Sequence, residues 1–234
     1  MKIKLPIEMA AQPDDVTCGP TSLYAVYRFF NYPCTLEQVI KGVKLLKEGG
    51  TLAVYLGLDA LKKGFKAELY TYNLHIFDPT WMELQPSELV VKLRQQLEFK
   101  KGKKFKLATE AYIQYLNAGG RICFENLTRK LLVSYFEKGL PILAGLSSTY
   151  LYQSMREYSI HGPKTHYDDL RGNPTGHFVV LAGINLDDVY VSDPFHENPY
   201  SRDHFYSMEV EYLINSILLG IMTYDGNMLI ISRD

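Results

Sequence analysis

The stretch from Gln12 to Leu23 reads QPDDVTCGPTSL, and it decides how the chain is interpreted. Within it, Cys18 stands directly before a Gly-Pro pair, and apolar residues recur at helical spacing from there to about Phe30. Proline is favoured in the first turn of a helix, where its missing N–H group is not needed. The pattern therefore predicts a helix with Cys18 at its N-terminus. Unpaired backbone N–H groups and the positive end of the helix dipole favour a thiolate there, so Cys18 is a candidate nucleophile.

A glutamine and a histidine are candidate partners for this thiol. Gln12 precedes Cys18 by 18 − 12 = 6 residues, and its amide would donate to a developing oxyanion together with the Cys18 backbone N–H. His177 opens a run over 177–184 that is rich in β-branched residues, and it follows a glycine that lets another segment approach closely. It is the candidate general base.

An acid ends the next expected strand. The run 189–193 finishes with Asp193, and the residues between the two runs have the composition of a turn. The midpoint (177 + 193)/2 = 185 falls on Asn185, so a hairpin centred there places His177 and Asp193 opposite one another on one face of the sheet. Asp193 would then hold the tautomer and the orientation of the imidazole.

This set of motifs resembles the C39-like branch of the papain-fold cysteine peptidases, which includes the bacteriocin leader-processing peptidases. The resemblance rests on the glutamine, the Asp-Asp-x-Thr-Cys-Gly-Pro stretch that heads a helix, the Gly-His pair before a hydrophobic run, and the Asp-Pro pair after the next strand. It implies a papain-like fold with Cys18 as nucleophile, His177 as general base and acid, Asp193 as the orienting residue and Gln12 as oxyanion donor. The implied substrate is a peptide or another amide, and no cofactor or metal is implied.

Two features differ from the leader peptidases. The chain lacks the transporter domains that those proteins carry, so a double-glycine leader substrate is not implied. Residues 73–120 contain no motif that we recognise, and we expect them to form a helical insert in a single domain over 1–234. Each candidate site residue also has a purely structural interpretation, since free cysteine, for example, is among the most buried residue types.

Two alternatives to a peptidase remain open. The first is an acyltransferase that passes the acyl group to an amine or a thiol, because phytochelatin synthases are similar in having a Cys-Gly-headed helix and a later His and Asp. The second is a catalytically silent module that keeps the fold for peptide recognition. The presence of Cys18, His177 and Asp193 together counts against the second alternative.

Composition argues against several classes of protein. The 234 residues carry a net charge of −1 and are 47% hydrophobic, which rules out intrinsic disorder and, without a Lys/Arg stripe, argues against nucleic-acid binding. The longest apolar runs, 140–146 and 178–184, are far below the ~18–20 residues that a membrane helix needs. The N-terminus lacks the apolar core of a secretory signal, so we expect a cytoplasmic protein. Three cysteines without a CxxC pair favour reduced thiols over a disulfide framework or a zinc site.

The order of elements predicts an α+β fold, with helices in the first half and antiparallel strands in the second. The expected helices are 20–30, 35–47, 51–63, 87–100, 107–117, 127–137 and 208–217, and the expected strands are the N-terminus, 65–72, 121–124, 140–146, 177–184, 189–193, 219–224 and 228–232. The last two strands are expected to form a hairpin across an Asp-Gly pair. The tyrosine-rich segment 147–176 is either a wall of the substrate cleft or a surface cover.

Overall fold

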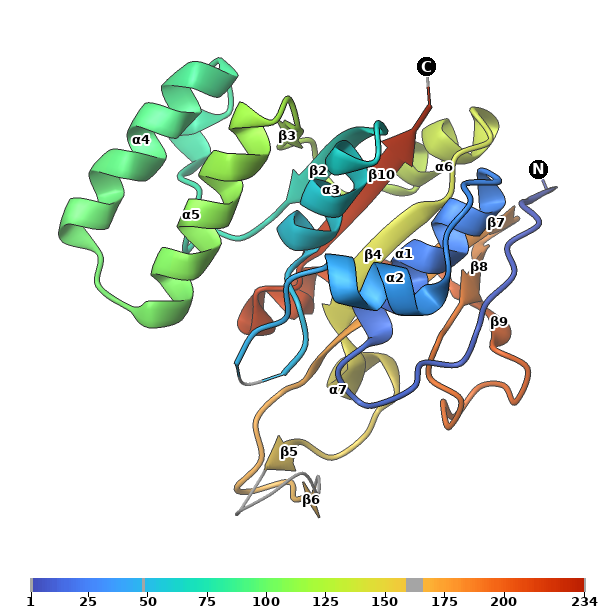
Figure 1. Cartoon of the computed structure of the whole chain (residues 1–234). Helices are drawn as coiled ribbons and strands as arrows, with labels where there is room; N and C mark the ends of the chain where they lie inside the picture. Colours follow the sequence, from blue (N-terminus) through green and yellow to red (C-terminus); the bar gives the residue numbers. More distant parts are fainter. Residues whose placement is uncertain (1, 48, 159–165, 234) are drawn as a thin grey trace.

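The centre of the protein is a mixed, mostly antiparallel sheet, seen in a computed structural model that describes residues 2–47, 49–158 and 166–233 (Figure 1). Its strands are β1 (Lys2–Lys4), β2 (Lys66–Thr71), β3 (Arg121–Cys123), β4 (Ile142–Ser147), β7 (Gly176–Asn185), β8 (Asp188–Ser192), β9 (Phe205–Glu209) and β10 (Asn227–Ser232). They follow the order β3-β2-β10-β4-β7-β8-β9, and β1 pairs with β7 beyond the end of β4. Strand β7 therefore has hydrogen-bonded neighbours on both sides.

Helices and short turns fill the rest of the chain. They are α1 (Cys18–Phe29), α2 (Leu36–Gly42), α3 (Ala53–Lys62), η1 (Pro79–Trp81), α4 (Pro86–Phe99), α5 (Lys103–Asn117), α6 (Arg129–Glu137), α7 (Ser148–Leu151), α8 (Val210–Leu219) and η2 (Gly220–Thr223). A two-stranded ribbon, β5 (Glu157–Tyr158) with β6 (His166–Tyr167), projects from one end of the sheet (Figure 1). The α+β class is confirmed, although β2 comes from the first half of the chain and pairs in parallel with β3.

Two hydrophobic cores lie on opposite faces of the sheet, because successive side chains of a strand point to opposite sides. In β7, Phe178, Val180 and Ala182 join the core under α1, α3 and α5, whereas Val179 and Leu181 join the core under α6 and α8. Every one of these five side chains is buried. The strand that carries the candidate histidine is thus held by packing on both faces as well as by hydrogen bonds on both edges.

The 73–120 segment contains the two expected helices. Helices α4 and α5 lie side by side at one end of the molecule (Figure 1). Side chains of α5 share a core with α3, and the Tyr115 hydroxyl donates to the Ala67 carbonyl of β2 at 2.7 Å. The helix pair is therefore anchored to the part of the sheet that β2 and β3 form.

Two predicted elements are wrong. Residues 219–224 do not form a strand; they end α8 and make η2, after which Tyr224 takes a left-handed conformation with φ of 73°. Strand β10 pairs instead with β2 on one side and β4 on the other, because a local Asp-Gly signal marks a reversal but does not choose the partner strand. The helix expected to run to Lys47 ends at Gly42. Within the described ranges, no helix combines the length and the apolarity that a bilayer crossing requires.

Candidate active site

Cys18 is the first residue of α1, as predicted, and its side chain is buried against the sheet. Close packing brings this end of the helix to β7: a Cβ atom on Gly19 would lie 2.6 Å from the side chain of Thr51 and 3.2 Å from that of Phe178. A hydrogen bond fixes the contact, because the buried Ser22 hydroxyl donates to the Phe178 carbonyl at 3.1 Å. Since Phe178 directly follows the candidate histidine, the first turns of α1 are tied to the residue beside it.

His177 and Asp193 are in contact. Nε2 of His177 lies 2.8 Å from Oδ1 of Asp193, and both side chains are buried. Three further donors satisfy the carboxylate: the Phe195 backbone N–H at Oδ1 (2.9 Å), and the hydroxyls of Tyr152 (2.7 Å) and Tyr206 (2.8 Å) at Oδ2. With Nε2 occupied in this way, Nδ1 is the ring nitrogen left for the Cys18 thiol.

The two residues meet diagonally across the ribbon, and the predicted directly opposed register is wrong. Strand β8 pairs Ser192 with Val180, and a register shift between Leu181 and Ile184 of β7 moves the turn along the chain. If this register continues for one more residue, Asp193 lies opposite the second residue after His177. Because side chains alternate with a period of two, the shift keeps both side chains on the same face of the sheet.

The charges of the three groups are coupled. Burial alone would lower the pKa of His177, but Asp193 and Cys18, each acting through its charge and a hydrogen bond, outweigh burial and raise the pKa from 6.5 to about 10. Burial would raise the pKa of Asp193, and the His177 charge with the donors around the carboxylate lowers it instead. The arrangement therefore favours the imidazolium form of His177 beside an ionised Asp193.

Gln12 lines the same cleft as His177, in a segment that the backbone fixes. Its backbone N–H donates to the Pro194 carbonyl at 2.9 Å, which ties it to the residue after Asp193. Its side-chain nitrogen donates to the Asp14 carbonyl at 2.8 Å, and since an amide nitrogen carries two hydrogens, one remains for a ligand. Asp14 itself stabilises the turn before α1, because its Oδ1 accepts from the Val16 N–H at 3.0 Å.

An open cleft of about 580 Å³ adjoins His177. The 147–176 segment supplies much of its wall, through Tyr152, Glu157 and Tyr167, and this agrees with the first of the two expectations for the segment. Residues 159–165 of that segment lie outside the described residues. The opposite wall comes from the residues before α1 and from those after Asp193, Phe195 among them.

A second buried carboxyl group lies behind the strand that carries His177. A Cβ atom on Gly176 would lie 1.8 Å from Oδ2 of Asp225, so only glycine fits at that position. Burial raises the pKa of Asp225 to about 7, although Thr223, Lys104 and His177 each act to lower it. Sequence reasoning did not single out this residue, because nothing in the Asp-Gly turn signal indicates burial.

The hydroxyl partners of Asp193 were also missed, as was the hydroxyl of Ser22. Tyr152 and Tyr206 belong to α7's end and to β9, separated from Asp193 in sequence by 41 and 13 residues. The high tyrosine content, 18 residues, is the one signal in the sequence that hydroxyl donors are plentiful. Which tyrosines meet Asp193 depends on contacts that the chain makes only when folded.

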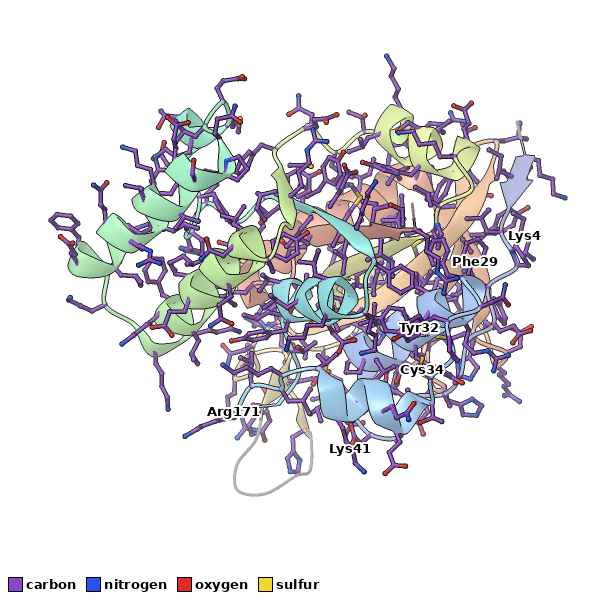
Figure 2. The ribbon with its side chains drawn as sticks, turned by 45° about the horizontal axis from the view of Figure 1, so that its top comes forward. Lys4, Phe29, Tyr32, Cys34, Lys41 and Arg171 are labelled. Carbon is purple, nitrogen blue, oxygen red and sulfur yellow. The ribbon has the colours of Figure 1, made fainter. Side chains whose placement is uncertain are left out.

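The other two cysteines lie apart from this site. Burial raises the pKa of Cys123, in β3, to about 11, and burial likewise raises the pKa of Cys34. Figure 2 shows Cys34 in the connection between α1 and α2, near Tyr32. All three cysteines are free thiols. Among the described residues, no group of three or more His, Cys, Asp or Glu side chains is placed to hold a metal ion.

Comparison with known protein families assigns the chain to a family. The model of the Peptidase_C39 like family matches residues 4–214, so the chain belongs to this family. The match confirms the resemblance drawn from the motifs, and with it the papain-like class of fold. Family and fold are those of C39-like cysteine peptidases.

Solved structures similar to this chain have low sequence identity to it. One is a double glycine motif protease from an AMS/PCAT transporter in complex with the leader peptide (15% identity, 100% of this chain and 99% of that one, TM-score 0.48). Another is a putative C39-like peptidase from Bacillus anthracis (13%, 100% and 98%, 0.49). A third is the peptidase domain of Streptococcus ComA, a bifunctional ABC transporter (14%, 97% and 99%, 0.45). No curated protein sequence matches the chain significantly.

Proposed function

We propose that this protein is a cysteine peptidase that cleaves an amide bond in a peptide through an acyl-enzyme thioester. The observation that carries the proposal is the position of the His177 ring, whose Nε2 lies 2.8 Å from the Asp193 carboxylate and which interacts with the Cys18 thiol at the start of α1. An imidazole oriented by an acid and facing a thiol is the arrangement that nucleophilic catalysis by cysteine requires. Family membership supports the assignment.

The proposed steps use only side chains and backbone groups of this chain. His177 takes the proton of Cys18, and the thiolate attacks the scissile carbonyl carbon. The backbone N–H of Cys18 and the free amide hydrogen of Gln12 donate to the oxyanion that forms. The C–N bond breaks as the imidazolium gives its proton to the leaving amine, which leaves a thioester. His177 then takes a proton from water, whose oxygen attacks the thioester, and the released thiolate recovers that proton.

The test is turnover of a mixed fluorogenic peptide library, with intact-mass detection of the acyl-enzyme. We expect Cys18→Ala to abolish both hydrolysis and the acyl adduct, whereas the matched control Cys34→Ala keeps both. Conjugates that appear on addition of amines or thiols, at the expense of hydrolysis, would assign the acyltransferase alternative instead.

Thiol reactivity tests the alternative that the protein is a catalytically silent module for peptide recognition. Because burial holds the thiols of Cys34 and Cys123 in their protonated forms, iodoacetamide at pH 6 should label Cys18 first. Peptide mapping by mass spectrometry measures the three rates in one sample. Equal rates for Cys18 and Cys34, together with no turnover, would contradict the peptidase.

We further propose that the chain works as one domain, in the cytoplasm. Helices α3 and α5 share one core, which supports treating the α4–α5 pair as an insert in that domain. A thiol nucleophile has to stay reduced, and the three free thiols fit a reducing compartment. Fractionation of cells that express the protein, with thiol trapping before lysis, measures both properties.

A further inference from the structure

The cleft beside His177 is acidic and partly aromatic. Among the described residues that line it, Asp15, Glu157 and Glu197 carry carboxylates and none is a lysine or arginine. Tyr152 and Phe195 line it as well, with ring centroids 6.0 Å apart. Carboxylates attract cations over the whole cleft, and aromatic ring faces attract them at short range.

The three carboxylates come from separate segments and act on the same space. Asp15 precedes α1, Glu157 belongs to β5, and Glu197 follows β8. Burial raises the pKa of the Tyr167 phenol, and the charges of Glu157, Asp15 and Glu197 raise it further, so all three lie near this ring. Burial raises the pKa of Glu157 against a hydrogen bond with Thr175, and two charges act on it in opposite directions, Asp15 raising the pKa and His177 lowering it. Like charges therefore repel one another in a cleft that adjoins the proposed nucleophile.

His177 is the one group among the described lining residues that can carry a positive charge, and no described lysine or arginine contacts these carboxylates. None of the three carboxylates forms an ion pair with a described residue. No described cluster has the geometry of a metal site, so the cleft does not suit a small inorganic cation. A volume of about 580 Å³ fits an extended organic cation, whose charge relieves the repulsion on entry.

We infer that this cleft binds a positively charged group of the substrate, a lysine or arginine side chain or a terminal ammonium, beside the scissile bond. The inference rests on the proposed function, since it assigns the specificity of the same cleft. Glu157 is the central residue, because it is half-buried in the wall, and Glu197 and Asp15 extend the negative potential toward solvent.

The first experiment measures charge selectivity at Cys18 without any turnover. A cationic and an anionic methanethiosulfonate, bearing trimethylammonium-ethyl and sulfonato-ethyl groups, each form a mixed disulfide with a thiolate and release methanesulfinate. Peptide mapping gives both rates for Cys18 and Cys34, normalised to the rates with a small free thiol. We expect the normalised cation-to-anion ratio to be about tenfold or more at Cys18 and near one at Cys34.

Variants that neutralise the carboxylates test whether the cleft causes the cation-to-anion ratio at Cys18. Glu157→Gln with Glu197→Gln should bring the Cys18 ratio down severalfold, whereas Glu137→Gln, an exposed control on α6, should leave it unchanged. A Cys18 ratio near one, or the same fall in the control, would overturn the inference while leaving the nucleophile in place. A Cys18 that reacts with neither reagent would contradict the proposed function itself.

The second experiment uses paired peptides that differ at one residue, lysine against Nε-acetyl-lysine. We expect kcat/KM to favour lysine, and the double glutamine variant to raise KM for the lysine peptide alone. Equal kcat/KM values in the wild-type protein would contradict the inference but not the peptidase. Added salt should weaken the preference, because it screens the carboxylates.

Discussion

At the scale of single residues, the candidate site depends on the hydrogen bonds that hold a carboxylate, Asp193, and a carboxamide, Gln12. Asp193 is held by four donors in a fully buried position, so its orientation toward His177 is fixed before any substrate arrives. Gln12 is held more loosely, through one amide hydrogen and its own backbone N–H. The first residue is therefore pre-organised for orientation, and the second for donation to a ligand.

Replacement of Gln12 tests that donation. Because its free amide hydrogen is placed to stabilise the oxyanion, Gln12→Ala should lower kcat by ~10²–10³ with little change in KM. Steady-state kinetics on the best library peptide measures the effect. The midpoint of thermal unfolding should stay within a few degrees of wild type, and a variant with full turnover would remove Gln12 from the mechanism.

Local sequence determined which of these residues could be named in advance. Cys18, Gln12 and His177 stand in short motifs whose chemistry follows from a helix start or a strand start, and Asp193 follows from the adjacent run. Ser22 and Asp225 gave no such signal, because their roles exist only through contacts with β7, 156 residues away for the Ser22 hydroxyl. Their positions depend on tertiary packing, which periodicity does not encode.

At the scale of elements, the contact between α1 and β7 decides whether the thiol meets the imidazole. Helix α1 and strand β7 were both predicted within a few residues from their periodicity and caps. Their contact was expected only from the family resemblance, since no local pattern states which strand a helix packs on. The same limit explains the wrong C-terminal hairpin, in which a reversal was recognised but β2 and β4 could not be chosen as partners.

Removal of the Ser22 hydroxyl tests this contact. Ser22→Ala deletes a buried hydrogen bond and should lower the free energy of unfolding by about 1 kcal/mol. It should also reduce kcat severalfold, because the first turn of α1 is then free to shift relative to His177.

A matched control lies in α8, where the buried Ser216 hydroxyl donates to the Tyr212 carbonyl at 2.8 Å. Ser216→Ala should show a similar loss of stability in urea unfolding with unchanged kcat. Equal kinetic effects of Ser22→Ala and Ser216→Ala would mean that the α1 contact does not position the thiol.

At the scale of the whole molecule, the buried ionisable groups set the pH range in which the fold is stable. His177 has a folded-state pKa of about 10, above its ordinary value of 6.5, so its contribution is complete below pH 6.5 and is lost as the pH rises toward 10. The lowered pKa of Asp193 gives the opposite sign, and its contribution is lost in acid. Asp225, with its pKa raised by burial to about 7, destabilises the fold increasingly as the pH rises from about 4 through 7.

Asp225→Asn therefore should stabilise the protein in a pH-dependent way. The amide keeps the shape of the carboxyl group beside Gly176 and cannot ionise, so the gain over wild type should grow by roughly 4 kcal/mol between pH 4 and pH 9. Urea unfolding at these two values measures it. The exposed Asp169→Asn serves as control, and a gain that is the same at both pH values would contradict a buried, ionising Asp225.

The class of fold could be predicted from the sequence, but the order of the strands in the sheet could not. Helices followed by strands predicted α+β, but the insertion of β10 between β2 and β4 joins the last segment of the chain to two earlier ones. A pairing over that distance has no local signature, because it is selected by the combined burial of both sheet faces.

The four hydrogen-bond donors around Asp193 connect the candidate site to the stability of the fold. They come from α7's end, β7, the turn after β8, and β9, so a single side chain cross-connects much of the C-terminal half of the protein. Loss of this carboxylate would leave two tyrosine hydroxyls and an imidazole buried without their hydrogen-bond partner. Variants at this position should therefore also be poorly expressed. Under the proposed mechanism, substitution of Asp193 would be opposed twice, once through turnover and once through the amount of protein that survives quality control.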